Sequence, residues 1–145
     1  IEGLGKGDDG MNIAFFLLPK DKVKYLSPES TVRQALEKMS YHRYTAVPLV
    51  SNDGYYAGTL TEGDLLWFIK KAIDDDQYEK CLGTKLKDVP QRVNNITVSI
   101  NANMKDLLTL AIDQNFVPVV DDQKYFIGII RRMDIIKYCA DMLYK

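Results

Sequence analysis

The sequence predicts an α/β protein made of two copies of a β-α-β-β-α unit, and three observations lead to this prediction. The apolar segment Ala46–Val50, which contains a Val-Pro pair, is echoed by Phe116–Val120. Apolar residues recur at helical spacing before each of these strands. Three landmark residues also recur without a gap 70 residues later: Pro48, Gly58 and Asp64 return as Pro118, Gly128 and Asp134. A repeat of this kind decides the architecture, so we expect two halves related by a pseudo-two-fold axis.

The first copy can be followed element by element along residues 31–60. Its first helix begins with a capping-box pattern, because Thr31 is followed three residues later by Gln34. The apolar face of that helix consists of Val32, Ala35, Leu36 and Met39. A strand over 46–50 then meets a turn at Asn52-Asp53-Gly54, whose residues tolerate the backbone angles of a tight turn. The chain returns as a strand over 55–60, and a second apolar helix follows.

The second copy repeats this order after a polar connector. Asn103 and Asp106 open its first helix, and its strands are expected over 117–120 and 126–130. The apolar face of the helix consists of Met104, Leu107, Leu108 and Ala111. The connector is charged and is expected to be partly helical near 77–82. Because neither half can cover both faces of so short a sheet, we expect two small sheets packed together with helices outside. The predicted organisation is an expression scar at 1–10, a first repeat with its N-terminal segment over 11–73, a linker over 74–90 and a second repeat over 91–145.

Composition argues against several classes of function. The 145 residues include 19 basic and 20 acidic side chains, and this balance gives little attraction to nucleic acid or to an anionic membrane. The apolar stretch Ile13–Leu18 is too short to span a bilayer, which takes about 20 residues, and is expected to be buried. Cys81 and Cys139 lie far apart, so neither a zinc site nor a redox motif is indicated, and a reducing cytoplasmic setting is expected. We therefore expect no metal and no cofactor.

A Val-Pro strand followed by the motif Gly58–Asp64, repeated once, resembles the CBS domain pair, also called a Bateman module. The resemblance covers residues 23 to 140. It implies a stand-alone regulatory module, a homodimer without catalytic residues, that binds AMP or ATP and signals to a separate protein of unknown identity. The string from Tyr44 to Pro48, together with Arg131 and Arg132, also resembles bacterial CBS-pair proteins that bind cyclic di-AMP.

The resemblance also implies which residues bind the nucleotide, since that family holds adenosine ligands in clefts between its two repeats. The base lies against the backbone near the Val-Pro strand, the ribose hydroxyls on the motif Asp, and the start of each repeat closes the pocket. A carboxylate can accept two hydrogen bonds from a vicinal diol, and guanidinium groups bind phosphate in a fork. The first copy would use Tyr25, Tyr44, Thr45, Ala46, Val47, Thr61 for phosphate and Asp64 for ribose. The second copy would use Thr97, Asn115, Phe116, Val117, Arg131, Arg132 and Asp134.

Structural explanations compete with these roles. Thr61 and Asp64 form a capping box by themselves, and Asp134 would also stabilise a helix dipole. Arg131 and Arg132 would equally suit a solvated helix start or a dimer contact. Of the aromatic residues after the first motif, Trp67 and Phe68 suit either the core or a partner surface.

Two further function classes compete with a nucleotide sensor. An enzyme is disfavoured, because no nucleophile, metal cluster or phosphate-binding Gly-rich loop accompanies His42, which we expect at the surface of a helix end. The alternative to a nucleotide sensor is a dimerisation or scaffold module without a physiological nucleotide ligand.

Overall fold

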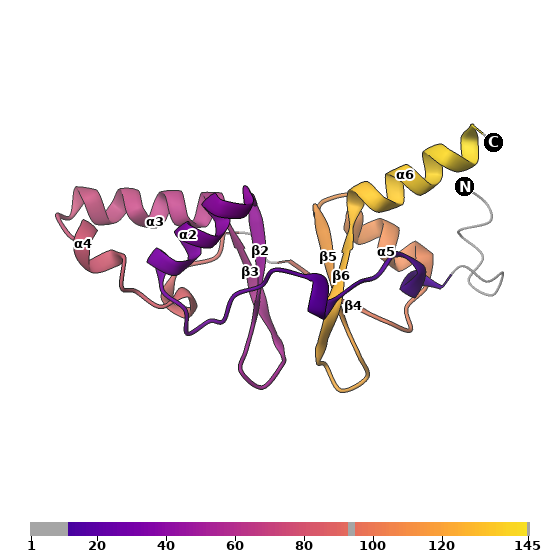
Figure 1. Ribbon diagram of the computed structural model, residues 1–145, viewed down its shortest axis with the longest axis horizontal. Coiled ribbons are helices and arrows are strands. Elements are labelled where there is room, and N and C mark those ends of the chain that lie inside the picture. The colour runs from indigo at the N-terminus through magenta and orange to yellow at the C-terminus, as the bar shows by residue number, and fades with distance from the viewer. Residues whose placement is uncertain (1–11, 93–94, 145) are drawn as a thin grey trace. The chain divides into compact units, whose positions relative to one another are not determined.

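The computed structural model describes residues 12–92 and 95–144, and these residues form two units (Figure 1). The first-repeat unit comprises residues 24–92, and the second-repeat unit comprises residues 12–23 together with 95–144. The predicted expression scar at 1–10 lies outside the described residues. Each unit combines a small sheet with helices, which confirms the predicted α/β class and its repeated β-α-β-β-α plan.

The first-repeat unit is an antiparallel hairpin with helices on one side of it (Figure 1). The hairpin pairs Val47 with Leu60 and Pro48 with Thr59. The isolated bridge between Leu26 and Leu49 adds a parallel contact at its edge. In chain order the elements are α2 (Val32–His42), β2 (Ala46–Val50), β3 (Tyr56–Thr61), α3 (Glu62–Asp74), α4 (Tyr78–Cys81) and the 3-10 turn η3 (Leu86–Asp88).

The start of α2 shows the capping box that the sequence predicts. The Thr31 hydroxyl accepts a hydrogen bond from the Gln34 backbone N–H at 3.2 Å, and the Gln34 side chain accepts one from the Thr31 N–H at 2.9 Å. The helix ends at His42, and the next residue, Arg43, has a left-handed backbone (φ 58°) that turns the chain toward β2. This reciprocal cap satisfies two amide donors that the helix itself leaves unpaired.

We expect Thr31→Ala to lower the free energy of unfolding by about 1 kcal/mol, because the cap is lost and the Gln34 amide loses its acceptor. Urea unfolding followed by circular dichroism measures this change. The control is Thr109→Ala, since Thr109 is exposed in the middle of α5 (Met104–Ala111) and alanine favours helix interiors. An equal loss in the two variants would contradict a specific role for the cap.

The second-repeat unit has a sheet of strand order β1-β6-β5-β4, in which β1 and β5 are antiparallel to β6 and β4 is parallel to β5. Helices α5 and α6 lie on one side of the β5–β6 hairpin (Figure 1). The elements are η1 (Ile13–Phe16), β1 (Leu18–Pro19), η2 (Lys20–Lys22), β4 (Val98–Ser99), α5 (Met104–Ala111), β5 (Phe116–Val120), β6 (Phe126–Arg131) and α6 (Arg132–Leu143).

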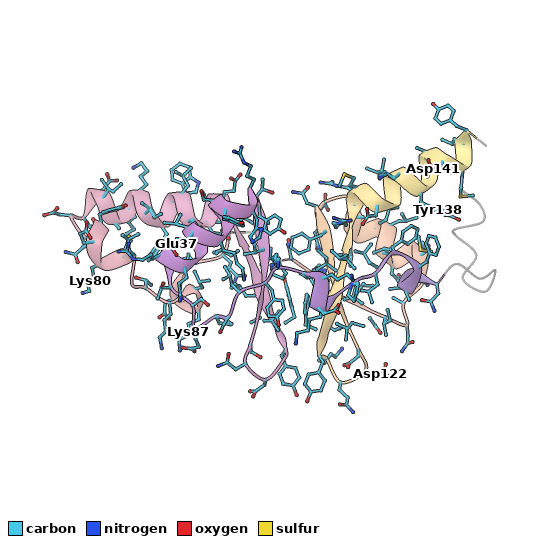
Figure 2. All side chains as sticks on the ribbon, viewed as in Figure 1. Glu37, Lys80, Lys87, Asp122, Tyr138 and Asp141 are labelled. Atoms are coloured by element: carbon cyan, nitrogen blue, oxygen red, sulfur yellow. The ribbon has the colours of Figure 1, made fainter. Side chains whose placement is uncertain are left out.

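The N-terminal segment packs on the second repeat, whereas the sequence alone suggested that it belongs with the first. Leu18 pairs with Ile129 in the sheet. Phe15 and Phe16 meet Tyr138 of α6, which is labelled in Figure 2, in edge-to-face contacts with ring centroids 5.5 and 5.3 Å apart. Aromatic pairs of this geometry add about 0.5–1.5 kcal/mol beyond burial. The expected burial of this segment is half right, because Phe16 is buried and Phe15 is 64% exposed.

Each unit has its own hydrophobic core. In the first-repeat unit the predicted helix face at Val32, Ala35 and Met39 packs against the buried side of the hairpin. The segment predicted as a linker over 74–90 belongs to the same core, because Leu82 and Leu86 are buried in it. The core of the second-repeat unit contains Ile13, Phe16, Val98, Met104, Leu107, Ala111, Val117, Val119, Ile130 and Ile135. Within the described residues, no helix is long and apolar enough to cross a bilayer.

Candidate functional site

The first motif residue, Asp64, forms a reciprocal cap at the start of α3. Its backbone N–H donates to the Thr61 hydroxyl at 3.1 Å, and its Oδ2 accepts from the Thr61 N–H at 3.0 Å. Thr61 is the last residue of β3 and the cap of α3. The capping interpretation of this pair is therefore confirmed, and it uses one oxygen of the carboxylate predicted to hold a ribose.

The second oxygen of Asp64 is also bonded within the protein. Oδ1 accepts a hydrogen bond from the Arg92 backbone N–H at 2.8 Å, and the Asp64 residue is 2% exposed. The Arg92 guanidinium lies over the ring of Trp67, with its Cζ 5.0 Å from the ring centroid. Both carboxylate oxygens are thus satisfied by backbone amides, which compensates for the cost of burying a charge.

The other predicted residues of the first copy surround the beginning of β2. Tyr25 is half-buried just before Leu26, which bonds to β2, and the Tyr25 carbonyl accepts from Lys38 Nζ at 3.0 Å. Tyr44 and Thr45 are exposed, and Tyr44 stacks on His42 at the end of α2.

The two predicted site residues that lie in β2, Ala46 and Val47, are less accessible to a ligand. Val47 is wholly buried in the core, and its backbone is paired with Leu60. Ala46 is half-buried opposite Thr61 in the hairpin. The structure therefore brings Ala46 next to Thr61 but leaves the Val47 side chain no role outside the core.

The second motif differs from the first in what holds its carboxylate. Arg131 Nε donates to Asp134 Oδ2 at 2.8 Å, and Arg131 Nη2 donates to Oδ1 at 3.3 Å. The side chains are 45% and 28% exposed respectively. Arg131 occupies the helix-cap position that Thr61 holds in the first copy, and among the described residues it makes no side-chain cap there. The Asp134 carboxylate is thus paired with an exposed side chain at the surface and remains in contact with solvent.

Arg132 closes the end of a helix. Its Nη1 donates to the carbonyls of Ala111 and Ile112 at 3.3 and 3.1 Å, and its Nη2 donates to the Asn115 side chain. The Arg132 backbone N–H also donates to the Asn115 carbonyl at 2.9 Å. A cation at the last carbonyls of α5 is favoured by the helix dipole. This structural role competes with the predicted contact to phosphate.

A model of the CBS domain matches this chain twice, over residues 17–71 and 86–141. The chain belongs to the CBS domain family. The matches cover both repeats and include both motif carboxylates, Asp64 and Asp134. The structure is thus that of a CBS pair, and the resemblance seen in the sequence is confirmed.

Known proteins similar to this CBS pair include a curated relative and several solved structures. Inosine-5'-monophosphate dehydrogenase of Methanocaldococcus jannaschii is 29% identical over 114 residues, which are 77% of this chain and 21% of that protein. A second protein of the same organism, MJ1225, is 23% identical over 84% of this chain and 47% of its own length. The chain therefore spans between a fifth and a half of the curated relatives that it matches.

Solved structures agree over most of the chain. A CBS domain protein from Streptococcus pneumoniae is 26% identical with a TM-score of 0.80, covering 91% of this chain and 88% of that one. CbpB of Listeria monocytogenes in complex with cyclic di-AMP is 21% identical with a TM-score of 0.77, covering 92% and 98%. CBSX2 of Arabidopsis thaliana in complex with AMP is 22% identical with a TM-score of 0.73, covering 92% and 98%. At these identities the last two show the shared fold.

Sequence reasoning missed Gln114, a buried polar residue between α5 and β5 of the second CBS repeat. Its Oε1 accepts from the Ile96 N–H at 2.8 Å, and its Nε2 donates to the Ile96 and Phe116 carbonyls at 3.1 and 3.3 Å. Gln114 thereby holds the chain next to Thr97, a predicted site residue that is half-buried. A glutamine after a helix carries no motif, so no signal in the sequence indicated this role.

The last two predicted residues of the second CBS repeat, Phe116 and Val117, begin β5. Phe116 is 8% exposed and Val117 is wholly buried, so both side chains belong mainly to the interior. The Val117 backbone pairs with Ile130 of the hairpin. The second repeat therefore repeats the arrangement around Val47 in the first.

A cleft of about 610 Å³ lies between α2 and α3 of the first repeat, and Asp64 is not part of its lining. Its floor includes Met39 and Leu65, and its rim includes Arg43, Glu62 and Leu66. Leu66 is 61% exposed. The cleft is open, and its lining mixes apolar side chains with the polar ones of Ser40, Arg43 and Glu62.

The described residues offer few groups for chemistry of other kinds. Within them, no cluster of three or more His, Cys, Asp or Glu side chains is placed to hold a metal ion. Cys81 is buried, and desolvation, with a smaller effect of Glu79, raises the pKa of its thiol. A thiol with a raised pKa is a poor nucleophile at neutral pH.

Proposed function

We propose that this CBS pair binds an adenine nucleotide, in the cytoplasm, and through that binding regulates a separate protein. Two proteins that share its fold were solved with such ligands, CbpB with cyclic di-AMP and CBSX2 with AMP. The single observation that carries the proposal is the pair formed by Arg131 and Asp134. It places a solvent-accessible carboxylate and a guanidinium side by side at the start of α6.

The chemistry of this pair suits the two ends of a nucleoside phosphate. The Asp134 carboxylate can accept two hydrogen bonds from a ribose diol, and the Arg131 fork can bind phosphate oxygens. Binding then exchanges one surface ion pair for two charge-assisted contacts. Because exposed ion pairs contribute only about 0–1 kcal/mol, opening this one costs little.

Regulation requires that the ligand bind two conformations of the protein with different affinity. Ligand binding then changes the affinity of the protein for its partner, and the size of that change is the coupling free energy. In this proposal the nucleotide is a signal and is not consumed. The protein should therefore release AMP, ATP or cyclic di-AMP unchanged after binding.

We expect isothermal titration of the nucleotide-stripped protein to show saturable binding of AMP, ATP or cyclic di-AMP. Asp134→Asn should weaken that binding at least about 10-fold, since a hydrogen bond to a charged group contributes about 1.5–3 kcal/mol. Asp141→Asn is the matched control, because it removes the same charge from an exposed position on the same helix. Asp141, labelled in Figure 2, lies toward the other end of α6.

Three results would contradict this proposal. Absence of heat with every ligand, in a folded protein, would reject adenine nucleotides of these three kinds. Equal loss in Asp134→Asn and Asp141→Asn would show that net charge matters and the motif does not. Chromatography that finds the bound nucleotide hydrolysed would replace the regulatory role with an enzymatic one.

One observation favours dimerisation as a second function. Leu66 and Ile136 stand 70 residues apart at equivalent positions of α3 and α6, and they are 61% and 59% exposed. Trp67 and Met133 add exposed apolar surface on the same two helices. Exposed apolar residues at matching places on two helices suit a symmetric contact with a second copy. A folded dimer in sedimentation experiments that binds no nucleotide would favour this scaffold role.

A further inference from the structure

The two motif carboxylates are equivalent in sequence but not in their surroundings. Asp64 is 2% exposed, and backbone amides of Thr61 and Arg92 bond to its two oxygens. Asp134 has a side chain that is 28% exposed and is paired with the side chain of Arg131. A backbone amide can leave its acceptor only if the chain moves, whereas an exposed side chain can rotate away.

The amide that bonds to Asp64 comes from Arg92, in the short segment 91–92 that follows the predicted linker and lies against β3 and α3. A Cβ atom at Gly58 would lie 2.5 Å from Gln91 Nε2, so Gly58 leaves the space that the Gln91 side chain fills. The next residue, Arg92, covers the ring of Trp67 with its guanidinium and bonds to Asp64 with its N–H. We call residues 91–92 the linker strap.

We propose that Asp64 is a positioning residue that fastens the linker strap to the start of α3, and that this closure leaves Asp134 as the motif carboxylate that a nucleotide reaches. The second half of this inference rests on the proposed function, and the first half does not. The observation behind both is that Asp64 is 2% exposed and that a backbone donor holds each of its oxygens, so a ribose diol does not reach this carboxylate while residue 92 stays in place.

Charge and burial explain why the strap stays closed. A buried carboxylate without donors is costly, and hydrogen bonds from N–H groups to a charged oxygen are about twice as strong as neutral ones. A ligand that took Arg92's place would also leave the Arg92 amide without its acceptor. The contact between Arg92 and Trp67 adds a cation–π attraction on the outer side.

Two matched pairs of variants test the strap by thermal unfolding. Arg92→Pro removes the backbone donor, whereas Arg92→Ala keeps it and removes only the guanidinium. We expect the melting temperature to fall by about 5–10 °C in Arg92→Pro and by less than about 4 °C in Arg92→Ala. The melting temperature of Asp64→Asn should fall as far as that of Arg92→Pro, because the amide nitrogen of asparagine cannot accept a hydrogen bond from an N–H. The melting temperature of Asp134→Asn should fall by less than about 3 °C, because the carboxylate that it removes belongs to an exposed ion pair.

Trp67 supplies a spectroscopic test that does not depend on stability, since it is the single tryptophan of the sequence. Its fluorescence emission, excited selectively at the red edge of tryptophan absorption, reports whether Arg92 covers its ring. Asp64→Asn should shift this emission toward the spectrum of Arg92→Ala, and Asp134→Asn should leave it unchanged. Saturating the wild-type protein with the nucleotide that it binds should also leave the emission unchanged.

The outcomes separate this inference from the proposed function. Equal melting temperatures for Asp64→Asn and Asp134→Asn, or for Arg92→Pro and Arg92→Ala, would overturn the strap even if no nucleotide binds. A nucleotide that binds and shifts Trp67 emission to the Arg92→Ala spectrum would show that the ligand displaces the strap, and would overturn the closure of the first motif. Failure of every ligand to bind would reject the proposed function and the role of Asp134 in binding a nucleotide. The melting temperatures of the Arg92 and Asp64 variants would still decide whether Asp64 holds the strap.

Discussion

Gly128→Ala is expected to lower the free energy of unfolding by about 3 kcal/mol, because overpacking and backbone strain cost about 1–3 kcal/mol each. An added Cβ atom would lie 2.3 Å from the Leu18 carbonyl oxygen and 2.8 Å from a methyl carbon of Leu17. The oxygen belongs to β1, which pairs with β6 at this glycine, so the clash cannot be relieved by rotating a side chain. Gly128 also has a φ of 156°, which side-chain-bearing residues rarely adopt.

Urea unfolding followed by circular dichroism measures this loss, because Trp67 lies in the other unit and fluorescence would not follow it. Gly63→Ala is the control, since its added Cβ would find Thr61 Oγ1 at 3.7 Å, an ordinary contact. Alanine in place of this helical glycine should raise the free energy of unfolding by about 0.5–1 kcal/mol. A Gly128→Ala protein as stable as the wild type would show that β1 does not lie against β6 in solution.

Gln114→Ala is expected to lower the free energy of unfolding by about 2–3 kcal/mol, since each buried backbone group left without a partner costs about 1–3 kcal/mol if water does not replace the bond. The side chain is 7% exposed and makes hydrogen bonds with the Ile96 N–H and with the Ile96 and Phe116 carbonyls. Its removal takes this partner away from all three backbone groups, of which the Phe116 carbonyl bond is the buried one.

The same urea experiment measures this change, and Gln123→Ala is its control. Gln123 is an exposed residue of the β5–β6 turn whose backbone N–H donates to the Asp121 side chain. Its substitution should change the free energy of unfolding by less than about 0.5 kcal/mol. If both variants lost the same free energy of unfolding, the hydrogen bonds of Gln114 to Ile96 and Phe116 would not stabilise the second repeat.

Local features of the fold were predictable from the sequence because they depend on neighbours along the chain. The cap formed by Thr31 and Gln34 spans three residues, and the hairpins follow from turn residues between short apolar strands. The repeat at 70 residues extended these local predictions from one half to the other. The same repeat indicated the family, because Asp64 and Asp134 are among its landmarks.

The sequence predicted which residues make up the candidate site, but it did not predict their hydrogen-bond partners or their burial. Arg132 was expected to meet phosphate, and the structure places it on the carbonyls that end α5. Asp64 and Asp134 were both expected to hold a ribose, yet Asp64 is buried and accepts a hydrogen bond from the backbone N–H of Arg92, 28 residues away. Such partners are set by how distant segments pack, and periodicity and spacing carry no information about them.

By itself the sequence determined the two β-α-β-β-α repeats, their helix starts and turns, and the positions of the two motif carboxylates, because these follow from local backbone preference and from the repeat. The tertiary structure alone decided that residues 12–23 pack on the second repeat and that residues 74–90 pack on the first. It also decided which carboxylate is buried and which meets solvent. The physical reason is that burial and long-range hydrogen bonding depend on surfaces that meet only once the chain has folded.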